Sequence, residues 1–241
     1  MTEHVRQATK RRAISGAALS VLLYAAPIWD CAIKHAKYKN MVASVQRKLA
    51  LRISSAYRTV SLEAAQVLAG LIPIDLKIKE RRQTHGNNNT GTREQIRQDI
   101  MKEWQDRWNG MQQKAKWTRT LIKDIQFWMD RRHGEVNYHM SQFLTGHGSF
   151  GKYLKRIRKV EEATCRYCGE EDTARHTFYE CGKWEEERGR VNAKMKGDFT
   201  PEKTIERIIE RQEIWEAVNS FVVEVIKEKE EDERRLPAAN G

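Results

Sequence analysis

Three cysteines and one histidine are grouped near the C-terminal end of this 241-residue chain, with the spacing C-x2-C-x7-H-x4-C: Cys165, Cys168, His176 and Cys181. Three thiolates and one imidazole complete a tetrahedral shell of the kind that holds a structural zinc ion. The alternative is a set of buried cysteines beside an unrelated histidine, but the metal-ligand spacing favours a shared ion. We therefore predict a zinc knuckle with these four residues as ligands.

The second half of this motif restricts the local backbone. His176 and Cys181 are five residues apart, and at about 100° per residue they would lie about 140° apart on an unbroken α-helix. The helix must therefore end or loosen between them, and Gly182 is a suitable residue for the break. Asp172 or Thr173 is a candidate cap for the helix that carries His176, and Gly169 allows the first two cysteines to face one point.

The chain is strongly basic, with a net charge of +11 and an isoelectric point near 9.5. Residues 1–60 hold 11 basic and two acidic side chains, which indicates a polyanionic partner, RNA or DNA first. An acid-free segment before the knuckle and a basic helix face near residue 50 are the candidate contacts: Lys152, Lys155, Arg156, Arg158 and Lys159, and Arg47, Lys48 and Arg52. The alternative for both groups is a solvated basic surface. We expect Phe150 and Tyr153 to dock their helix rather than to stack on bases.

Composition and periodicity predict a mostly α-helical protein, in which a helical bundle precedes a helical C-terminal region with the small knuckle. The expected helices include 36–56, 61–69, 73–85, 93–113, 116–132, 149–160 and 201–230. Aromatic stripes in the third quarter of the chain are expected to be core. The polar run at 86–92 is the predicted linker, so the expected parts are 1–85, 93–160, 161–183 and 184–241.

An apolar segment, 13–29, follows three basic residues and could be a membrane anchor. Ser15, Gly16, Ser20 and Pro27 interrupt it, and it is shorter than a typical span of about 20 residues, so we expect a buried helix. The fourth cysteine, Cys31, has no obvious partner, which suits a reducing, intracellular compartment.

Several stretches together resemble one family. The segments 20–31 (SVLLYAAPIWDC), 46–76 (QRKLALRISSAYRTVSLEAAQVLAGLIPIDL) and 143–158 (FLTGHGSFGKYLKRIR), followed by the knuckle and Trp184, are similar in wording and order to the C-terminal part of Pol from insect non-LTR retrotransposons, above all R1-like elements. The resemblance covers roughly residues 15–190 and implies that residues 1–85 are the thumb of a reverse transcriptase.

The family's Pol carries an endonuclease and a reverse transcriptase, and it extends a nicked genomic end on element RNA. A polymerase palm needs paired aspartates to hold Mg²⁺, and this chain has no Asp-Asp pair. The resemblance therefore implies a fragment without catalytic residues. Its implied partners are RNA or DNA and the rest of the polyprotein, not a small-molecule substrate or a membrane, and its implied place of action on genomic DNA is the nucleus.

Two other functions are compatible with the residues. A free-standing zinc-stabilised protein-interaction module would bind nucleic acid weakly. A cysteine enzyme would use Cys31 with Asp30 and His35, but no third orienting group is evident for it.

Overall fold

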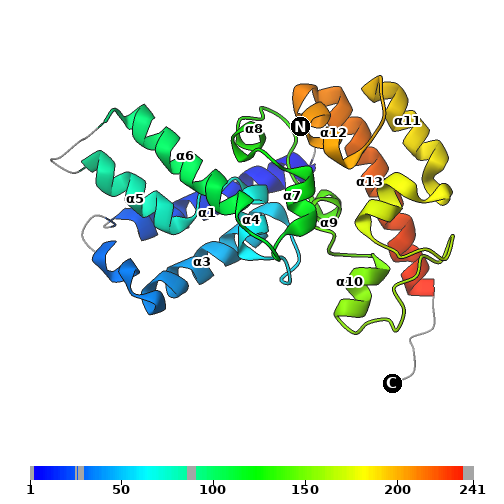
Figure 1. Ribbon diagram of the computed structural model, residues 1–241, viewed down its shortest axis with the longest axis horizontal. Coiled ribbons are helices and arrows are strands. Elements are labelled where there is room, and N and C mark those ends of the chain that lie inside the picture. The colour runs from blue at the N-terminus through cyan, green and yellow to red at the C-terminus, as the bar shows by residue number, and fades with distance from the viewer. Residues whose placement is uncertain (1–2, 25, 27–29, 86–90, 236–241) are drawn as a thin grey trace. The chain divides into compact units, whose positions relative to one another are not determined.

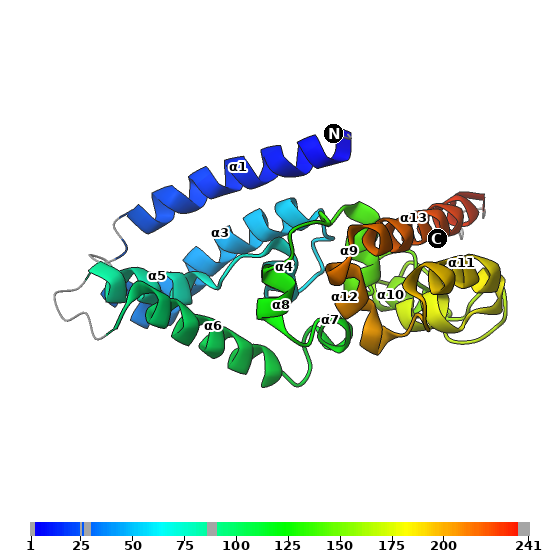
Figure 2. The same cartoon turned by 90° about the horizontal axis from the view of Figure 1, so that it is seen from above.

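The computed structural model describes residues 3–24, 26, 30–85 and 91–235, and within these ranges the protein is built from helices with no strand (Figures 1 and 2). The one β-type pairing among them is an isolated antiparallel bridge between Thr164 and Glu171. The predicted mostly α-helical class is confirmed.

The helices form two compact units. The first comprises residues 1–119, 123–130 and 135–137, and the second comprises 120–122, 131–134 and 138–241. The helices on either side of the predicted 86–92 linker lie in the same unit, because the inner stripe of 93–109 is buried against the helix before it. Apart from the short stretches 120–122 and 135–137, the units divide after residue 130. Residues 86–90 lie outside the described ranges.

The first unit contains the helices that the resemblance assigns to a thumb. Its elements are α1 (Glu3–Tyr24), η1 (Asp30–Lys34), α3 (Ala36–Ser54), α4 (Leu62–Ala69), α5 (Ile74–His85), α6 (Arg93–Asn109) and α8 (Ile125–Met129). Helices α3 and α4 pack together around Ala50, Ile53 and Ala65. The α6 stripe Ile96, Ile100, Trp104 and Trp108 is buried, as expected for core residues.

The limits of α4 follow from the residues that flank it. The Ser61 hydroxyl accepts a hydrogen bond from the Ala64 amide at 3.2 Å, which caps the first turn. Gly70 ends the helix with φ of 69°, a left-handed conformation that glycine adopts without a steric penalty. Both ends agree with the sequence-based prediction.

The predicted single helix over 116–132 is wrong. The chain instead forms α7 (Lys116–Leu121) and α8, with a break at residues 122–124. Asp124 begins the second helix, because its carboxylate accepts a hydrogen bond from the Phe127 amide at 2.8 Å.

The second unit is arranged around its last helix. Its elements are α9 (Tyr138–Thr145), α10 (Gly151–Arg156), η2 (His176–Glu180), η3 (Gly182–Trp184), α11 (Glu185–Met195), α12 (Pro201–Glu210) and α13 (Gln212–Arg235). Helices α9, α11 and α12 each pack on α13. The predicted continuous helix over 201–230 is interrupted at Arg211, whose backbone is extended (φ −139°, ψ 131°). The basic helix predicted at 149–160 is shorter, spanning α10 only.

Aromatic side chains form the core beneath the cysteine cluster. Phe178 is fully buried, and its ring centroid lies 4.8 Å from that of Phe143 and 5.8 Å from that of Phe221. Phe199 joins the same cluster, stacked on Tyr179 at 4.6 Å. Since Phe178 lies between His176 and Cys181 in the chain, this core anchors the segment that carries two of the predicted ligands.

No helix in the described part of the chain is long and apolar enough to cross a membrane. Residues 13–24 of the apolar segment form the second half of α1, and residues 25 and 27–29 lie outside the described ranges. The expected buried helix is wrong for residues 13–24, where only Ser15 and Leu23 are buried and Ile14, Val21 and Tyr24 are exposed.

Gln46 organises a buried polar junction in the first unit. Its amide nitrogen donates to the Ile72 carbonyl at 2.7 Å, and its oxygen accepts from Gln66 at 2.7 Å and from the Ile74 amide at 2.9 Å. One side chain thereby satisfies the backbone at the start of α5 and links α3 to α4. Buried polar groups that lose such partners carry the full cost of their desolvation.

We expect Gln46→Met to destabilise the protein by about 3 kcal/mol. The substitution would leave the Ile72 carbonyl, the Ile74 N–H and the Gln66 amide in the interior without their hydrogen-bond partner. Urea unfolding followed by far-UV circular dichroism measures this loss. The exposed Gln112→Met variant is the matched control and should unfold like the parent. Equal unfolding midpoints for both variants would contradict the assigned role of Gln46.

Candidate metal centre

The four predicted ligands meet in one cluster. The three cysteine Sγ atoms and a ring nitrogen of His176 all lie within 4.8 Å of one another. Cys181 Sγ lies 3.9 Å from Cys165 Sγ and 4.0 Å from Cys168 Sγ. A tetrahedral zinc ion with Zn–S bonds of about 2.3 Å separates two sulfurs by roughly 3.8 Å, so the sulfur spacing fits such an ion. His176 Nε2 lies closer to Cys168 Sγ, at 3.1 Å.

A tight turn brings the first two cysteines together. The Gly169 amide donates to the Cys165 carbonyl at 2.8 Å, and the Cys165 amide donates to the Glu170 carbonyl at 2.6 Å. Gly169 has φ of 82°, in the left-handed region. The backbone around Cys165 and Cys168 therefore folds back as the sequence predicts.

A π-helical turn brings His176 and Cys181 to the same side. The Thr173 hydroxyl caps the segment by accepting from the His176 amide at 2.9 Å. The Cys181 amide then donates to the His176 carbonyl at 2.8 Å, a hydrogen bond between residues five apart. The predicted loosening of the helix is thus present as a wider turn, and the helix ends at Glu180, before Gly182.

The electrostatics of the cluster suit a cation. Burial, reinforced by the nearby Cys165 sulfur, raises the pKa of the Cys181 thiol to about 12. A thiolate at this position needs a positive partner, and a divalent ion with strong preference for sulfur provides one. The donor set of three sulfurs and one imidazole nitrogen could therefore hold a metal ion, and it has the composition of structural zinc sites.

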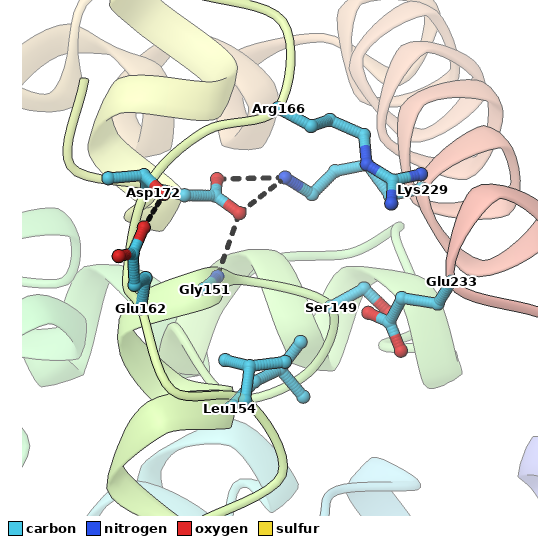
Figure 3. Close-up of a pocket in the computed structure, with 10 residues that line it drawn as sticks. Ser149, Gly151, Leu154, Glu162, Arg166, Asp172, Lys229 and Glu233 are labelled. Carbon is cyan, nitrogen blue, oxygen red and sulfur yellow. Dashed lines mark hydrogen bonds and ion pairs between the residues drawn. The ribbon is translucent and has the colours of Figure 1, made fainter. Parts of the chain in front are cut away.

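Asp172, which lies between Cys168 and His176 in the chain, ties the cysteine-bearing segment to the rest of the second unit. Figure 3 shows its contacts with Gly151 and Lys229. Asp172 is 6% exposed, and its carboxylate accepts from the Gly151 amide at 2.7 Å and the Thr177 hydroxyl at 2.9 Å. The Lys229 ammonium donates to both carboxylate oxygens, at 2.8 and 2.9 Å. Asp172 was expected only as a helix cap, but it joins α10, η2 and α13.

The sequence position of Lys229 indicates that this residue has a buried partner. Lys229 lies three and four residues beyond Ile226 and Val225, on the buried face of α13. A lysine on an apolar stripe needs a buried partner. Gly151 has a matching constraint, since a Cβ there would lie 3.1 Å from the Asp172 Cβ and from the Ala163 backbone.

The predicted basic segment is exposed but partly paired. Lys152 pairs with Glu171 at 2.9 Å, and Lys159 pairs with Glu233 at 2.9 Å. Arg156 contacts the His147 ring nitrogen at 3.0 Å and lies over the Tyr153 ring. Burial, then the Arg156 charge, lowers the pKa of His147 to about 4, which leaves the ring neutral to accept from the guanidinium. Phe150 and Tyr153 are buried, which agrees with a docking role.

The basic face of α3 has a divided role. Arg47 donates to the backbone carbonyls of Arg58 and Val60, at 2.5 and 2.6 Å, so its guanidinium supports the chain after α3. Lys48 and Arg52 are exposed. The three residues share a positive charge in the sequence, but the carbonyls that Arg47 reaches are brought to it only by the fold.

The chain is similar in sequence to Pol proteins of R1 elements. It is 25% identical to the retrovirus-related Pol polyprotein from type-1 retrotransposable element R1 4 of Nasonia vitripennis, over 69% of this chain and 47% of the relative. It is also 25% identical to that of element R1 2 of the same wasp, over 75% and 49%. An R1 Pol polyprotein of Bradysia coprophila is 22% identical, over 72% of this chain and 19% of the relative.

The chain is a homologue of R1 Pol polyproteins. The resemblance drawn from its motifs is thereby confirmed. No family model and no solved structure matches it. This Pol homologue spans about half the length of the two Nasonia relatives.

We expect the purified protein to hold one zinc ion per chain, and Cys168→Ser to abolish it. Cys31→Ser, which changes an exposed cysteine outside the cluster, is the control and should retain the metal. Retention should fall as pH is lowered, because protons compete for the sulfur and imidazole ligands. Elemental analysis after dialysis measures the content. Equal zinc in the parent and in Cys168→Ser would remove the site.

We expect Lys229→Met to destabilise the protein by about 3–5 kcal/mol, since it leaves the Asp172 carboxylate buried without its cation. Lys227→Met, on the exposed face of the same helix, should change stability little. Thermal unfolding compares the two. A melting temperature for Lys229→Met equal to that of the control would show that the buried pair does not contribute.

Proposed function

We propose that this chain is the C-terminal part of a non-LTR retrotransposon Pol polyprotein, and that it binds element RNA or target DNA during target-primed reverse transcription. Homology to R1 Pol polyproteins supports the first statement. The adjacency of an exposed basic segment and a cluster of metal-ligating residues supports the second, because phosphate contacts by Lys and Arg supply most of the affinity for nucleic acid.

Different parts of the parent polyprotein would carry different steps of the reaction. Polymerase and endonuclease steps, with the Mg²⁺ they need, belong to other parts of the polyprotein. A zinc ion held by the four ligands would have a structural role, fixing the turn and the π-helical segment. The first unit, which includes the thumb-like residues 1–85, would hold the template–primer duplex by its phosphates. Action on genomic DNA places the protein in the nucleus.

One observation carries the binding proposal. Lys155 and Arg158 are exposed, and within the described ranges neither side chain has an ion-pair or hydrogen-bond partner. Lys155 lies in the last turn of α10 and Arg158 two residues beyond its end. Arg156, between them, contacts the neutral His147 ring and keeps its positive charge. These three residues therefore offer cations to a phosphate chain without breaking an existing ion pair.

A protein-interaction module is the second candidate. An apolar stripe on α1 favours it, since Ile14, Val21 and Tyr24 are 52%, 78% and 86% exposed. Such a stripe is typical of a surface that another protein covers. The two functions differ in their salt dependence, because phosphate contacts release counterions and apolar contacts do not.

We expect the chain to bind single-stranded RNA with a slope of log affinity against log salt of roughly −3, if about four phosphates are contacted. The substitution of Lys155, Arg156 and Arg158 by Ala should weaken binding for all sequences alike and flatten the slope by about 2. Fluorescence anisotropy at several salt concentrations measures both quantities.

The matched control replaces three exposed lysines elsewhere in the second unit with Ala: Lys194, Lys203 and Lys227. It has the same net charge as the α10 variant and should retain most of the slope. Zinc content and helicity should be unchanged in both. Identical affinity and slope in the parent and the α10 variant would refute the proposed contacts.

A further inference from the structure

Three cations, placed before, between and after the cysteine ligands in the chain, pair with carboxylates of α13. Lys159 precedes the knuckle, Arg166 lies in the Cys165–Cys168 turn, and Lys183 follows Cys181. Lys159 Nζ lies 2.9 Å from Glu233, Arg166 NH1 lies 3.4 Å from Asp232, and Lys183 Nζ lies 3.0 Å from Glu228. Three segments of the knuckle region thus present positive charge to the last three turns of one helix.

The carboxylates on α13 are placed in helical register. Glu224, Glu228 and Asp232 follow one another at intervals of four residues, so they share one face of the helix. Glu224 lies 3.6 Å from Arg190 of α11, and Asp232 also accepts from the Tyr167 hydroxyl at 2.6 Å. That hydrogen bond, followed by Arg166, lowers the pKa of Asp232 and keeps it ionised. The face is an evenly spaced row of negative charges.

These pairs differ from the buried pair beneath them. The Lys229 and Asp172 side chains are 7% and 9% exposed, whereas Lys159, Arg166 and Lys183 are 60%, 36% and 40% exposed. A buried pair is costly to break, but an exposed pair contributes little, about 0–1 kcal/mol. The three exposed cations can therefore exchange one anionic partner for another while Lys229 keeps α13 in place.

We propose that Lys159, Arg166 and Lys183 form a second phosphate-binding row for the nucleic-acid backbone, and that Glu228, Asp232 and Glu233 of α13 occupy it in place of phosphates. This inference rests on the proposed function. Nucleic acid bound along α10 reaches this row through Lys159, which follows Arg158 directly. The acidic helix then competes with the phosphodiester chain and lowers the affinity of the knuckle region.

The decisive variant neutralises the competing carboxylates: Glu228→Gln, Asp232→Asn and Glu233→Gln together. It should bind single-stranded RNA about tenfold more tightly at about 0.1 M salt. If all three cations gain a phosphate, the salt slope should steepen by about 2, at about 0.7 per phosphate. Replacing Lys159, Arg166 and Lys183 with Ala in the same background should cancel both changes.

The control carries the same change in net charge at exposed glutamates that pair with no cation in the described part of the chain: Glu186, Glu206 and Glu216, each changed to Gln. It should gain little affinity and keep the parental slope. The single variant Glu228→Gln releases only Lys183 and should steepen the slope by about 0.7. This single change preserves a test if the triple variant loses helicity.

The outcomes separate the two proposals. Equal affinity and slope for the neutralised variant and its control, with parental binding intact, would overturn the second row and leave the proposed function standing. Absence of binding by the parent, the neutralised variant and the control alike would overturn both. A gain that appears in the neutralised variant and disappears without its three cations would establish the row.

Discussion

The buried ion pair between Asp172 and Lys229 is the contact on which the second unit depends. Asp172 receives four hydrogen bonds, from α10, from the segment of His176 and from α13. A shift of α13 that separated the pair would leave an uncompensated charge in the interior, which is strongly destabilising. The pair therefore fixes the rotation of α13 about its own axis and its position along that axis. This placement of α13 positions the cysteine cluster, the aromatic core around Phe178 and the basic segment after Gly151.

The same helix makes two kinds of electrostatic contact. Toward the interior, its Lys229 pairs with the buried Asp172 carboxylate, and this pair is not available to an outside ligand. Toward the knuckle it offers carboxylates to exposed cations, where water and salt compete easily. The division allows the framework to stay rigid while the surface charges remain available to a ligand. A zinc ion would add a third constraint, on the turn and the π-helical segment only.

Much of this architecture was predictable where a local rule decides the structure. Ser61 and Gly70 delimit a helix by capping, and the spacing of His176 and Cys181 excludes a regular helix between them. Predictions failed where tertiary contacts decide. The helix breaks before Asp124 and at Arg211 interrupt apolar stripes that continue in the sequence, and the carbonyls reached by Arg47 could not be inferred from charge. Lys229 on an apolar stripe signalled a buried partner, but not that the partner is Asp172.

The π-helical turn between His176 and Cys181 has a consequence for how the motif tolerates insertions and deletions. In an ordinary α-helix, residues four apart share a face; in this turn, residues five apart do so. Removal of one residue from the turn would let the backbone relax to the α-helical form while the two ligands kept facing the same point. Related chains could therefore build the same shell with three or four intervening residues, and the length of this interval is a weaker mark of ancestry than the ligands themselves.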